Sequence, residues 1–411
     1  MSVAPSGVPV QASIMNPTAG SGRVHKVRVR RGVAVNQSRT MQHWLSAMFG
    51  VSYLGLGSLV PFLALVLQQR GVDGVMLTAA LGALPLSRLV FGPLWSVLAD
   101  RFQAPTRMVR IGAGCSALGA LALWQVSAGW WVVVAMLVLA VGRAPAGPVL
   151  DGLTLKSLGD RSEYGRVRRW GSVGFMVGVV GVGWLIDHTD YGPLEVVAVV
   201  SVLFWALSVV MPSADAMERV EVLPALKALM SDRFVRWMIP AAALHFAPHV
   251  GNTSFIAVHM DGLGHAALWT GLAIAGGVTL EIVLMGYSAS ILSRFGVERL
   301  LLGAMALAIP RWALMTVLTS PVAIVAVNMV HGITFGMFWI AGVALMSDRA
   351  PERVATSAQG LLALAVGGIG SSLGIMGASW IATTWDTTVM YQVATITALL
   401  GTGSALMAVR R

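Results

Sequence analysis

The chain has 411 residues, 56% of them hydrophobic and only 11% charged, with a mean hydropathy of +0.76 and a formal net charge of +10. Because soluble domains carry about 25% charged residues, this composition excludes a soluble globular protein and indicates a chain that crosses a membrane repeatedly. The basic residues lie between apolar segments, as in membrane loops, so we expect contact with a lipid bilayer and no nucleic-acid partner.

Residues 1–40 are polar and rich in Pro, Gly and Ser, and their second half is basic. They contain no apolar core followed by a small-residue cleavage site, which a secretory signal peptide requires. We therefore expect a disordered cytoplasmic tail before the first membrane span.

Twelve apolar segments follow the tail, and each is long enough to cross about 30 Å of hydrocarbon as a helix. The first six cover residues 41–67, 76–97, 107–127, 130–150, 167–187 and 194–212. The other six cover residues 236–259, 268–291, 299–318, 321–345, 356–382 and 387–408. We predict an all-α membrane protein with twelve transmembrane helices.

The loop 213–235 is the longest between spans, and it divides the chain into an N-terminal half (41–212) and a C-terminal half (236–411) of six helices each. A weak repeat relates the halves, because Asp100-Arg101-Phe102 and Ser293-Arg294-Phe295 each follow the second span of their half. Repeated halves around a midplane binding site are typical of secondary transporters. We expect the loop to be a cytoplasmic linker.

Lys and Arg residues concentrate in the loops on the side of the tail and the linker, whereas the opposite loops carry acids such as Asp187 and Asp261. The positive-inside rule then places both termini in the cytoplasm. We therefore predict a multi-pass protein of the cytoplasmic (inner) membrane.

Three ionisable residues, Glu281, Arg311 and His331, fall inside spans eight, nine and ten. A charged group near the centre of a membrane helix costs about 2.5–3.5 kcal/mol, so such residues are usually functional. An acid, a base and a titratable imidazole are what a proton-coupled carrier needs, and we predict that they form its proton-coupling site. The alternative is a static ion pair that stabilises packing.

Four further polar residues lie within spans. Arg88 and Arg143, in spans two and four, are candidates for the substrate site, and Arg88 has the alternative of reaching the membrane surface. His245 and His249 are four residues apart and share one face of span seven. A metal site needs further ligands that the sequence does not supply, so we predict core or cavity-lining histidines, with no metal and no cofactor.

A basic stretch leads into span five, and one of its arginines is distinguished by spacing. Arg168 shares a helix face with Gly171 and Gly178, and this small face can border a cavity. We predict that Arg168 faces a central cavity and contacts substrate, while Arg166 and Arg169 stay at the membrane surface. The alternative is that Arg168 only anchors the helix at that surface.

Short motifs along the whole chain carry a resemblance to a known family. They are Gly57 with Pro61-Phe62, Arg143-x-x-x-Gly147, Arg311-Trp312, and residues 164–172, 281–284, 293–296, 331–336 and 358–360. In this order they resemble the major facilitator superfamily. Within it the chain is most similar to the phenylpropionate permease group, close to the nucleoside–proton symporters and more distantly to lactose permease.

The resemblance implies the major facilitator fold and proton–substrate symport. In lactose permease, an acid of span eight, an arginine of span nine and a histidine of span ten form the coupling network. These positions match Glu281, Arg311 and His331, and the span-five arginine that helps to bind sugar there matches Arg168.

The resemblance also implies a cytoplasmic gate. Asp100-Arg101 is similar to the superfamily's loop motif after span two, and Arg294 holds the equivalent place after span eight, so we predict a gating role for all three. The motif departs from the family pattern, because Ser96 and Gln103 replace its usual glycines.

Two departures concern the substrate. The additional span-ten carboxylate of lactose permease is absent, and Thr334 stands one turn after His331. A Tyr-rich stretch of span seven is replaced by Asn252-Thr253, so sugar specificity does not transfer. We predict substrate binding by Arg168, Arg143, Asn252, His249 and Trp312.

The sequence therefore predicts a monomeric secondary transporter that takes up a small organic solute with protons, by alternating access. The arginines within the spans favour an anionic solute, such as an aromatic carboxylate. The alternative within the same fold is a proton-driven antiporter that exports a drug or metabolite. A polytopic enzyme or receptor is a more remote alternative, and since HExxH and GxxxxGK[ST] motifs are absent, we predict no enzyme activity.

Overall fold

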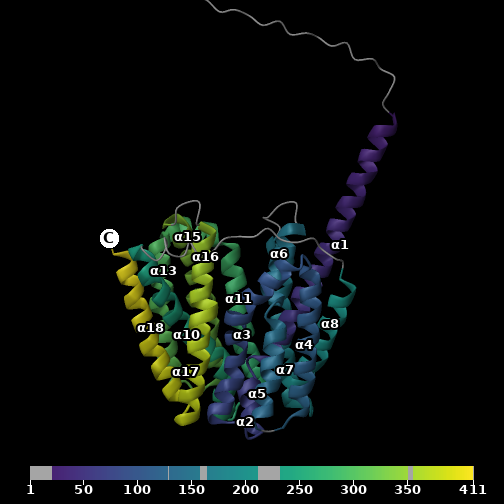
Figure 1. The fold of residues 1–411 in the computed structure, drawn as a ribbon. Helices are drawn as coiled ribbons and strands as arrows, with labels where there is room; N and C mark the ends of the chain where they lie inside the picture. The colour runs from purple at the N-terminus through teal and green to yellow at the C-terminus, as the bar shows by residue number, and fades with distance from the viewer. Residues whose placement is uncertain (1–20, 128, 158–163, 212–231, 350–354, 411) are drawn as a thin grey trace, which may run out of the picture.

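The computed structural model of the protein is a bundle of helices, with both ends of the described chain at the same end of the bundle (Figure 1). It describes residues 21–127, 129–157, 164–211, 232–349 and 355–410, and these contain helices and no strand. Seven of the described helices are each long and apolar enough to cross a membrane, and a bent pair in the first span makes an eighth. The predicted all-α membrane fold is confirmed.

The helices of the N-terminal half coincide with the first six predicted spans. They are α1 Ser21–Leu59, α2 Leu63–Gln69, α3 Gly74–Arg101, α4 Pro105–Gln125, α5 Trp130–Arg143, α6 Ala146–Ser157, α7 Tyr164–His188 and α8 Pro193–Val210. The first span bends by 45° between α1 and α2, at Pro61, and the fourth is broken between α5 and α6, at Pro145. Proline lacks an N–H donor and its ring clashes with the preceding turn, which explains both breaks.

The helices of the C-terminal half coincide with the last six predicted spans. They are α10 Arg233–Gly262, α11 Ala267–Gly286, α12 Ser288–Phe295, α13 Val297–Met315, α14 Pro321–Met329, η2 Gly332–Met337, α15 Phe338–Arg349, α16 Ala355–Leu364, η4 Ala365–Gly370, α17 Ser371–Thr384 and α18 Thr387–Val409. Spans ten and eleven each contain a π-helical turn, η2 and η4. Such turns occur frequently at functional sites.

The predicted disordered tail differs from the structure in its second part, because residues 21–40 are helical and continuous with the first span as α1. This segment contains no proline, and once a spanning helix exists, each added residue gains a hydrogen bond without a new nucleation step. Residues 1–20 lie outside the described residues, as does most of the predicted linker 213–235.

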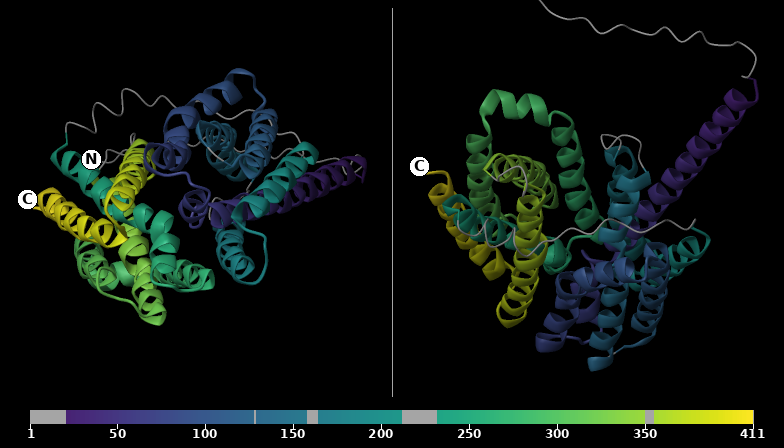
Figure 2. Two further views of the ribbon diagram at one scale, coloured as in Figure 1. Left: turned by 90° about the horizontal axis from the view of Figure 1, so that it is seen from below. Right: turned by 45° about the horizontal axis from the view of Figure 1, so that its top comes forward.

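The two halves are joined at the end of the bundle remote from the described termini (Figures 1 and 2). Asp187, at the end of α7, accepts hydrogen bonds from the backbone N–H groups of Ala267 and Leu268 at the start of α11, both at 2.8 Å. A Cβ atom added to Gly183 would lie 2.8 Å from the Ala267 carbonyl oxygen, so glycine is required for this close approach.

The buried hydrophobic clusters also show where the two halves meet and where they are apart. One buried cluster combines residues of both halves, among them Phe62 and Phe255, near a 2.8 Å contact between the hydroxyls of Thr78 in α3 and Ser379 in α17. The other two clusters each lie within one half. Their residues, such as Leu45, are nearer the end of the bundle at which the described chain begins and ends. The halves therefore share a core at the remote end and have separate cores at the terminal end.

Candidate functional site

A cavity of about 640 Å³ lies between the halves, within the range of about 300–1,000 Å³ that small-molecule sites occupy. Its wall comes from α1, α2, α3, α5, α6 and α7 of the N-terminal half and from α10, η2, α15, α16, η4 and α17 of the C-terminal half. Arg88, Arg143 and Arg168 contribute to the wall, and none of the described residues that line it is acidic. The cavity is therefore a positively charged site.

Arg143 is the last residue of α5 and contacts α1. Its Nη2 donates a hydrogen bond to the carbonyl oxygen of Ser52 at 2.7 Å and lies 3.3 Å from the Ser52 hydroxyl oxygen. Both partners are neutral, so these contacts orient the guanidinium without neutralising its charge.

Arg168, on α7, lies against Tyr53 of α1. Its guanidinium carbon is 4.2 Å from the centre of the Tyr53 ring, and Nη2 donates a hydrogen bond to the Tyr53 hydroxyl. A Cβ atom at Gly171 would lie 2.6 Å from Arg168 Nη1, so the glycine leaves room for this side chain. Arg166 and Arg169 are exposed and do not line the cavity.

Asp151 of α6 carries a carboxylate near this arginine group. It accepts a hydrogen bond of 2.7 Å from the Tyr164 hydroxyl and interacts electrostatically with Arg88 and Arg168. Because Asp151 does not line the cavity, the surface that a solute meets keeps its positive character.

Glu281 of α11 and His331, between α14 and η2, form a pair with 3.6 Å between Oε2 and Nε2. Two glycines of η2 allow this approach, because a Cβ atom at Gly332 would lie 2.6 Å from the Glu281 backbone nitrogen and one at Gly336 would lie 3.2 Å from Glu281 Cγ. His331 lines the cavity and Glu281 does not, so the carboxylate lies behind the imidazole.

Arg311 of α13 is 3% exposed and has only neutral hydrogen-bond partners. Its Nη1 donates to the Thr334 hydroxyl oxygen at 2.9 Å and its Nη2 to Asn328 Oδ1 at 3.4 Å. Among the described residues no carboxylate lies within 4.0 Å of its guanidinium. The structure thus joins Glu281 to His331 and not to Arg311.

The predicted substrate-binding residues of the C-terminal half divide into two groups. His249 lines the cavity and lies 3.0 Å from the Thr334 hydroxyl oxygen through its Nε2. Asn252 and Trp312 are buried behind the wall, where Asn252 accepts a hydrogen bond from the Tyr391 hydroxyl at 2.9 Å. Of the five predicted residues, Arg143, Arg168 and His249 are at the cavity.

Aromatic residues of the cavity wall were missed by the sequence reasoning. They are Tyr53, Phe175, Phe246, Phe335 and Trp339. Aromatic residues are common throughout apolar spans, so nothing local distinguishes these five. Only the position of Phe335, one turn after His331, associates one of them with a predicted site residue.

Two of the three predicted gating residues, Arg101 and Arg294, do not line the cavity. Arg101, at the end of α3, is exposed, and Arg294 near the end of α12 is exposed with its guanidinium 5.6 Å from the Phe295 ring centre. The side chain of Asp100 lies outside the described residues. Within the described part of the chain, no group of three or more His, Cys, Asp or Glu side chains could hold a metal ion.

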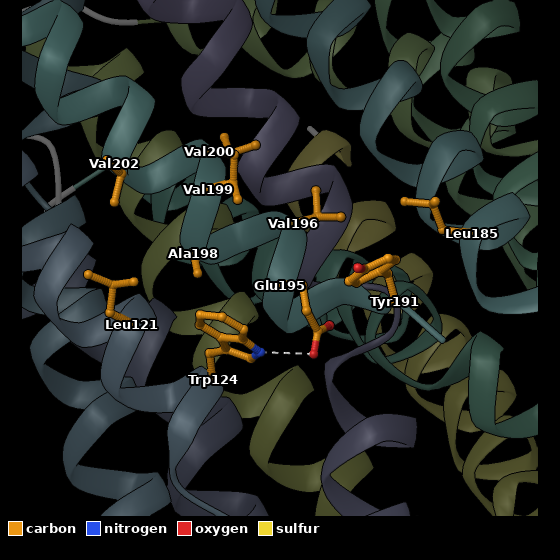
Figure 3. A pocket seen from close by; sticks show the side chains of 10 residues that line it. All are labelled: Leu121, Trp124, Leu185, Tyr191, Glu195, Val196, Ala198, Val199, Val200 and Val202. Atoms are coloured by element: carbon orange, nitrogen blue, oxygen red, sulfur yellow. Dashed lines mark hydrogen bonds between the residues drawn. The ribbon is translucent and has the colours of Figure 1, made fainter. Parts of the chain in front are cut away.

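A second hollow of about 590 Å³ lies among α4, α7 and α8 and is lined by Leu121, Trp124, Leu185, Tyr191, Glu195, Val196, Ala198, Val199, Val200 and Val202 (Figure 3). Its one acidic side chain, Glu195, accepts hydrogen bonds from Trp124 Nε1 at 3.1 Å and from the Gly192 backbone nitrogen at 2.9 Å. Its one charged group is engaged and most of the other lining residues are aliphatic, so it is a poor candidate for a polar solute.

Comparison with known proteins agrees with this architecture. The chain is 25% identical over 373 residues to a maltose permease of Geobacillus stearothermophilus, covering 87% of this chain and 92% of that protein. It is 24% identical over 333 residues to a probable 3-phenylpropionic acid transporter of Escherichia coli (strain K12), covering 79% and 87%.

Among solved structures, the nucleoside transporter NupG is similar to the fold with a TM-score of 0.80 at 16% identity, covering 90% of this chain and 99% of that one. The model of the MFS_1 like family matches residues 42–393. Together with the described helices and the cavity between two halves, this match shows that the chain is a multi-pass membrane transporter of the major facilitator type and belongs to the MFS_1 like family.

Proposed function

We propose that the protein is a proton-coupled symporter that imports a small organic anion, such as an aromatic carboxylate, across the cytoplasmic membrane. The observation that carries this proposal is the cavity wall, which holds Arg88, Arg143 and Arg168 and no acidic residue among the described positions. A concave surface of one charge sign attracts solutes of the opposite sign.

The solute's carboxylate is proposed to bind Arg143 and Arg168, because a guanidinium offers two parallel donors that match a carboxylate. The apolar part of the solute would lie among the aromatic residues of the wall, including Phe246, Phe335 and Trp339. A neutral sugar or nucleoside would leave Arg143, whose hydrogen-bond partners are neutral, without an anionic partner, which makes such solutes the less favoured candidates.

The proton is proposed to be carried by the Glu281–His331 pair. A carboxylate and an imidazole 3.6 Å apart form an ion pair when the imidazole is protonated, and only the imidazole lines the cavity. Arg311, behind Thr334, supplies a fixed charge next to this pair.

We propose that both termini are cytoplasmic, as the positive-inside rule indicates. The end closed by Asp187 and α11 then faces the outside, and the structure represents an inward-facing state of a monomer that works by alternating access.

The test is uptake by purified protein in proteoliposomes with an imposed pH gradient, using 3-phenylpropionate, maltose and uridine as the solutes. We expect 3-phenylpropionate to accumulate when the external side is acidic, and no accumulation when neither a pH gradient nor a membrane potential is imposed. Accumulation of maltose or uridine alone would overturn the anionic assignment. Extrusion of the solute against an inward proton gradient would establish the antiport alternative.

A further inference from the structure

His249 borders the cavity from α10 and is 2% exposed. Its Nδ1 lies 2.8 Å from the carbonyl oxygen of His245, and its Nε2 lies 3.0 Å from the hydroxyl oxygen of Thr334. A carbonyl oxygen only accepts hydrogen bonds, so Nδ1 carries the proton. In neutral His249, Nε2 is therefore unprotonated and accepts a hydrogen bond from the Thr334 hydroxyl.

The same reasoning assigns the proton of His245. Its Nε2 lies 2.8 Å from the Thr334 carbonyl oxygen, so Nε2 carries the proton. Its Nδ1 is buried and has no hydrogen-bond partner among the described residues. Protonation of His245 would leave a buried donor without an acceptor, so His249 is the member of the pair that can take a proton.

The Thr334 hydroxyl has one proton to donate and can accept two hydrogen bonds. Arg311 Nη1 donates to it at 2.9 Å. While His249 is neutral, the hydroxyl donates to His249 Nε2. When His249 is protonated, the hydroxyl accepts from Nε2 and turns its own proton to the Val330 carbonyl oxygen, 3.3 Å away. The hydroxyl is thus satisfied in both states.

Protonated His249 is a second cation beside Arg311, so this state depends on a compensating negative charge. In that state, the two cations Arg311 and His249 donate to the same hydroxyl oxygen, and no described carboxylate contacts either of them. Three other sets of ionisable groups face His249. On the same helix lies the neutral His245. At the cavity wall lies His331, whose ring centre is 5.4 Å from that of His249 and whose partner is Glu281, and the arginines of the wall complete the set. A negative charge in the cavity would offset the repulsion.

We propose that His249 takes up a proton when an anionic solute enters the cavity, and that Thr334 is the positioning residue whose hydroxyl changes partner in this step. The proton passes from the aqueous medium to Nε2 and forms an N–H bond. The Thr334–His249 hydrogen bond reverses direction, and the Thr334–Val330 hydrogen bond forms. The proposal rests on the proposed function only for the anionic character of the solute.

The first test needs no solute. The full chain, with its histidine side chains labelled with ¹⁵N, is studied by NMR in lipid bilayers, and the His249 signals are assigned by their loss in His249→Asn. Above pH 7 we expect neutral His249 with the proton on Nδ1 and with Nε2 hydrogen-bonded. Thr334→Ser should retain the Nε2 hydrogen bond and Thr334→Val should lose it. A proton on Nε2, or a fully protonated ring at that pH, would overturn the proposal.

The second test uses 3-phenylpropionate exchange between pH 6 and 8, where this probe remains an anion. In the wild type, the KM should rise by up to about tenfold per pH unit, the limit for one linked proton. In His249→Asn the KM should vary less than about twofold over the whole range. Thr334→Val should resemble His249→Asn, and Thr334→Ser should resemble the wild type. Equal pH dependence in Thr334→Val and the wild type would contradict the assigned role of the hydroxyl.

Glu281→Gln separates this proposal from the proposed function. It should abolish accumulation while the pH dependence of KM in exchange persists, because His249 and Thr334 remain in place. If the probe is not transported at all, the anionic assignment fails, and the NMR experiment without solute still decides where the protons of His249 lie.

Discussion

Arg311 is a cation held inside the C-terminal half by neutral groups, and its Nε has no partner among the described residues. Removing a charge from water costs several kcal/mol, and hydrogen bonds to the Thr334 hydroxyl and the Asn328 amide oxygen offset this only in part. A residue this costly is expected to contribute to function, through its field at the adjoining imidazoles.

Glu281 can be tested by a single substitution. Glu281→Gln should abolish accumulation of solute against a concentration gradient and should leave downhill exchange intact. The amide retains the size of the side chain and resembles the protonated carboxyl, but it can neither bind nor release a proton, so the carrier could exchange solute but could not return empty, whatever proton His249 carries. The measurement is pH-driven uptake and exchange in the same proteoliposomes. Glu298→Gln is the matched control, since Glu298 is half-buried, forms a 3.2 Å ion pair with Arg349 and does not line the cavity. Full pH-driven uptake by Glu281→Gln would remove this residue from the coupling site.

Arg168 is expected to be shielded by bound solute. In a Cys115→Ser background, Arg168→Cys should react more slowly with a thiol reagent when 3-phenylpropionate is present. Arg166→Cys and Arg169→Cys should react at the same rate with and without it, because these positions are exposed and outside the cavity. Equal labelling of all three positions in both conditions would leave Arg168 as an anchor at the membrane surface.

The sequence indicated ionisable residues as candidates for the site but did not predict their contacts. Glu281, Arg311 and His331 were recognisable because charges inside apolar spans are costly. Their pairing depends on the rotation of each helix and on η2, which shifts the residues after His331 relative to an α-helix. The local spacing of residues does not predict either of these. Thr334 is uncharged, so the sequence indicated it only as a departure from the span-ten carboxylate of lactose permease.

Among the elements, η2 and α11 fit together through glycine. Gly332→Ala would place a Cβ atom 2.6 Å from the Glu281 backbone nitrogen, so α11 must move away or η2 must rearrange. We expect a loss of about 1–3 kcal/mol in stability, typical of overpacking, together with weaker proton coupling. The measurements are thermal unfolding in detergent and pH-driven uptake.

The control for that substitution is Gly303→Ala in α13, where an added Cβ atom meets nothing within 4 Å. Alanine is favoured over glycine inside a helix by about 0.5–1 kcal/mol, so this variant should be as stable as the wild type or more so. If both variants unfold at the same temperature, the contact between η2 and α11 is not tight.

Helix existence was predictable from hydropathy, whereas helix breaks were not. Pro61 and Pro145 lie at breaks, but Pro85, Pro248 and Pro310 lie inside continuous helices. A proline breaks a membrane helix only where neighbouring groups do not satisfy the carbonyl that it frees, and those neighbours come from other parts of the chain. The positions of the π-helical turns η2 and η4 were likewise not predictable from the residues within them, because they also depend on contacts with other helices.

For the whole molecule, the contact between Asp187 and the first turn of α11 holds one end of the bundle closed. A carboxylate at a helix N-terminus accepts from free N–H groups and interacts favourably with the helix dipole. Asp187→Asn removes the charge and one acceptor, so the outward-open state should become more populated. A Val60→Cys reporter in the cavity wall should then react several-fold faster with an external thiol reagent.

Asp190→Asn is the control, because Asp190 is an exposed acid three residues after Asp187, whereas the carboxylate hydrogen bonds to the start of α11 come from Asp187. It should leave the reaction rate of the reporter unchanged. A faster rate in both variants would attribute the effect to surface charge, and an unchanged rate in Asp187→Asn would show that the other contacts between the halves hold this end closed without the Asp187 carboxylate.

The two proposed proton sites, the Glu281–His331 pair and His249, are distinct side chains whose imidazole centres lie 5.4 Å apart, so together they would load two protons beside one anion. An anion that crosses with a single proton moves no net charge, whereas two protons carry one positive charge inward. The membrane voltage then contributes about 2.3 kcal/mol per 100 mV to accumulation. We expect an inside-negative potential, set with potassium and valinomycin at equal pH, to drive 3-phenylpropionate uptake by the wild type and not by His249→Asn. Such a carrier would continue to load its solute in a cell whose surroundings have the same pH as its interior.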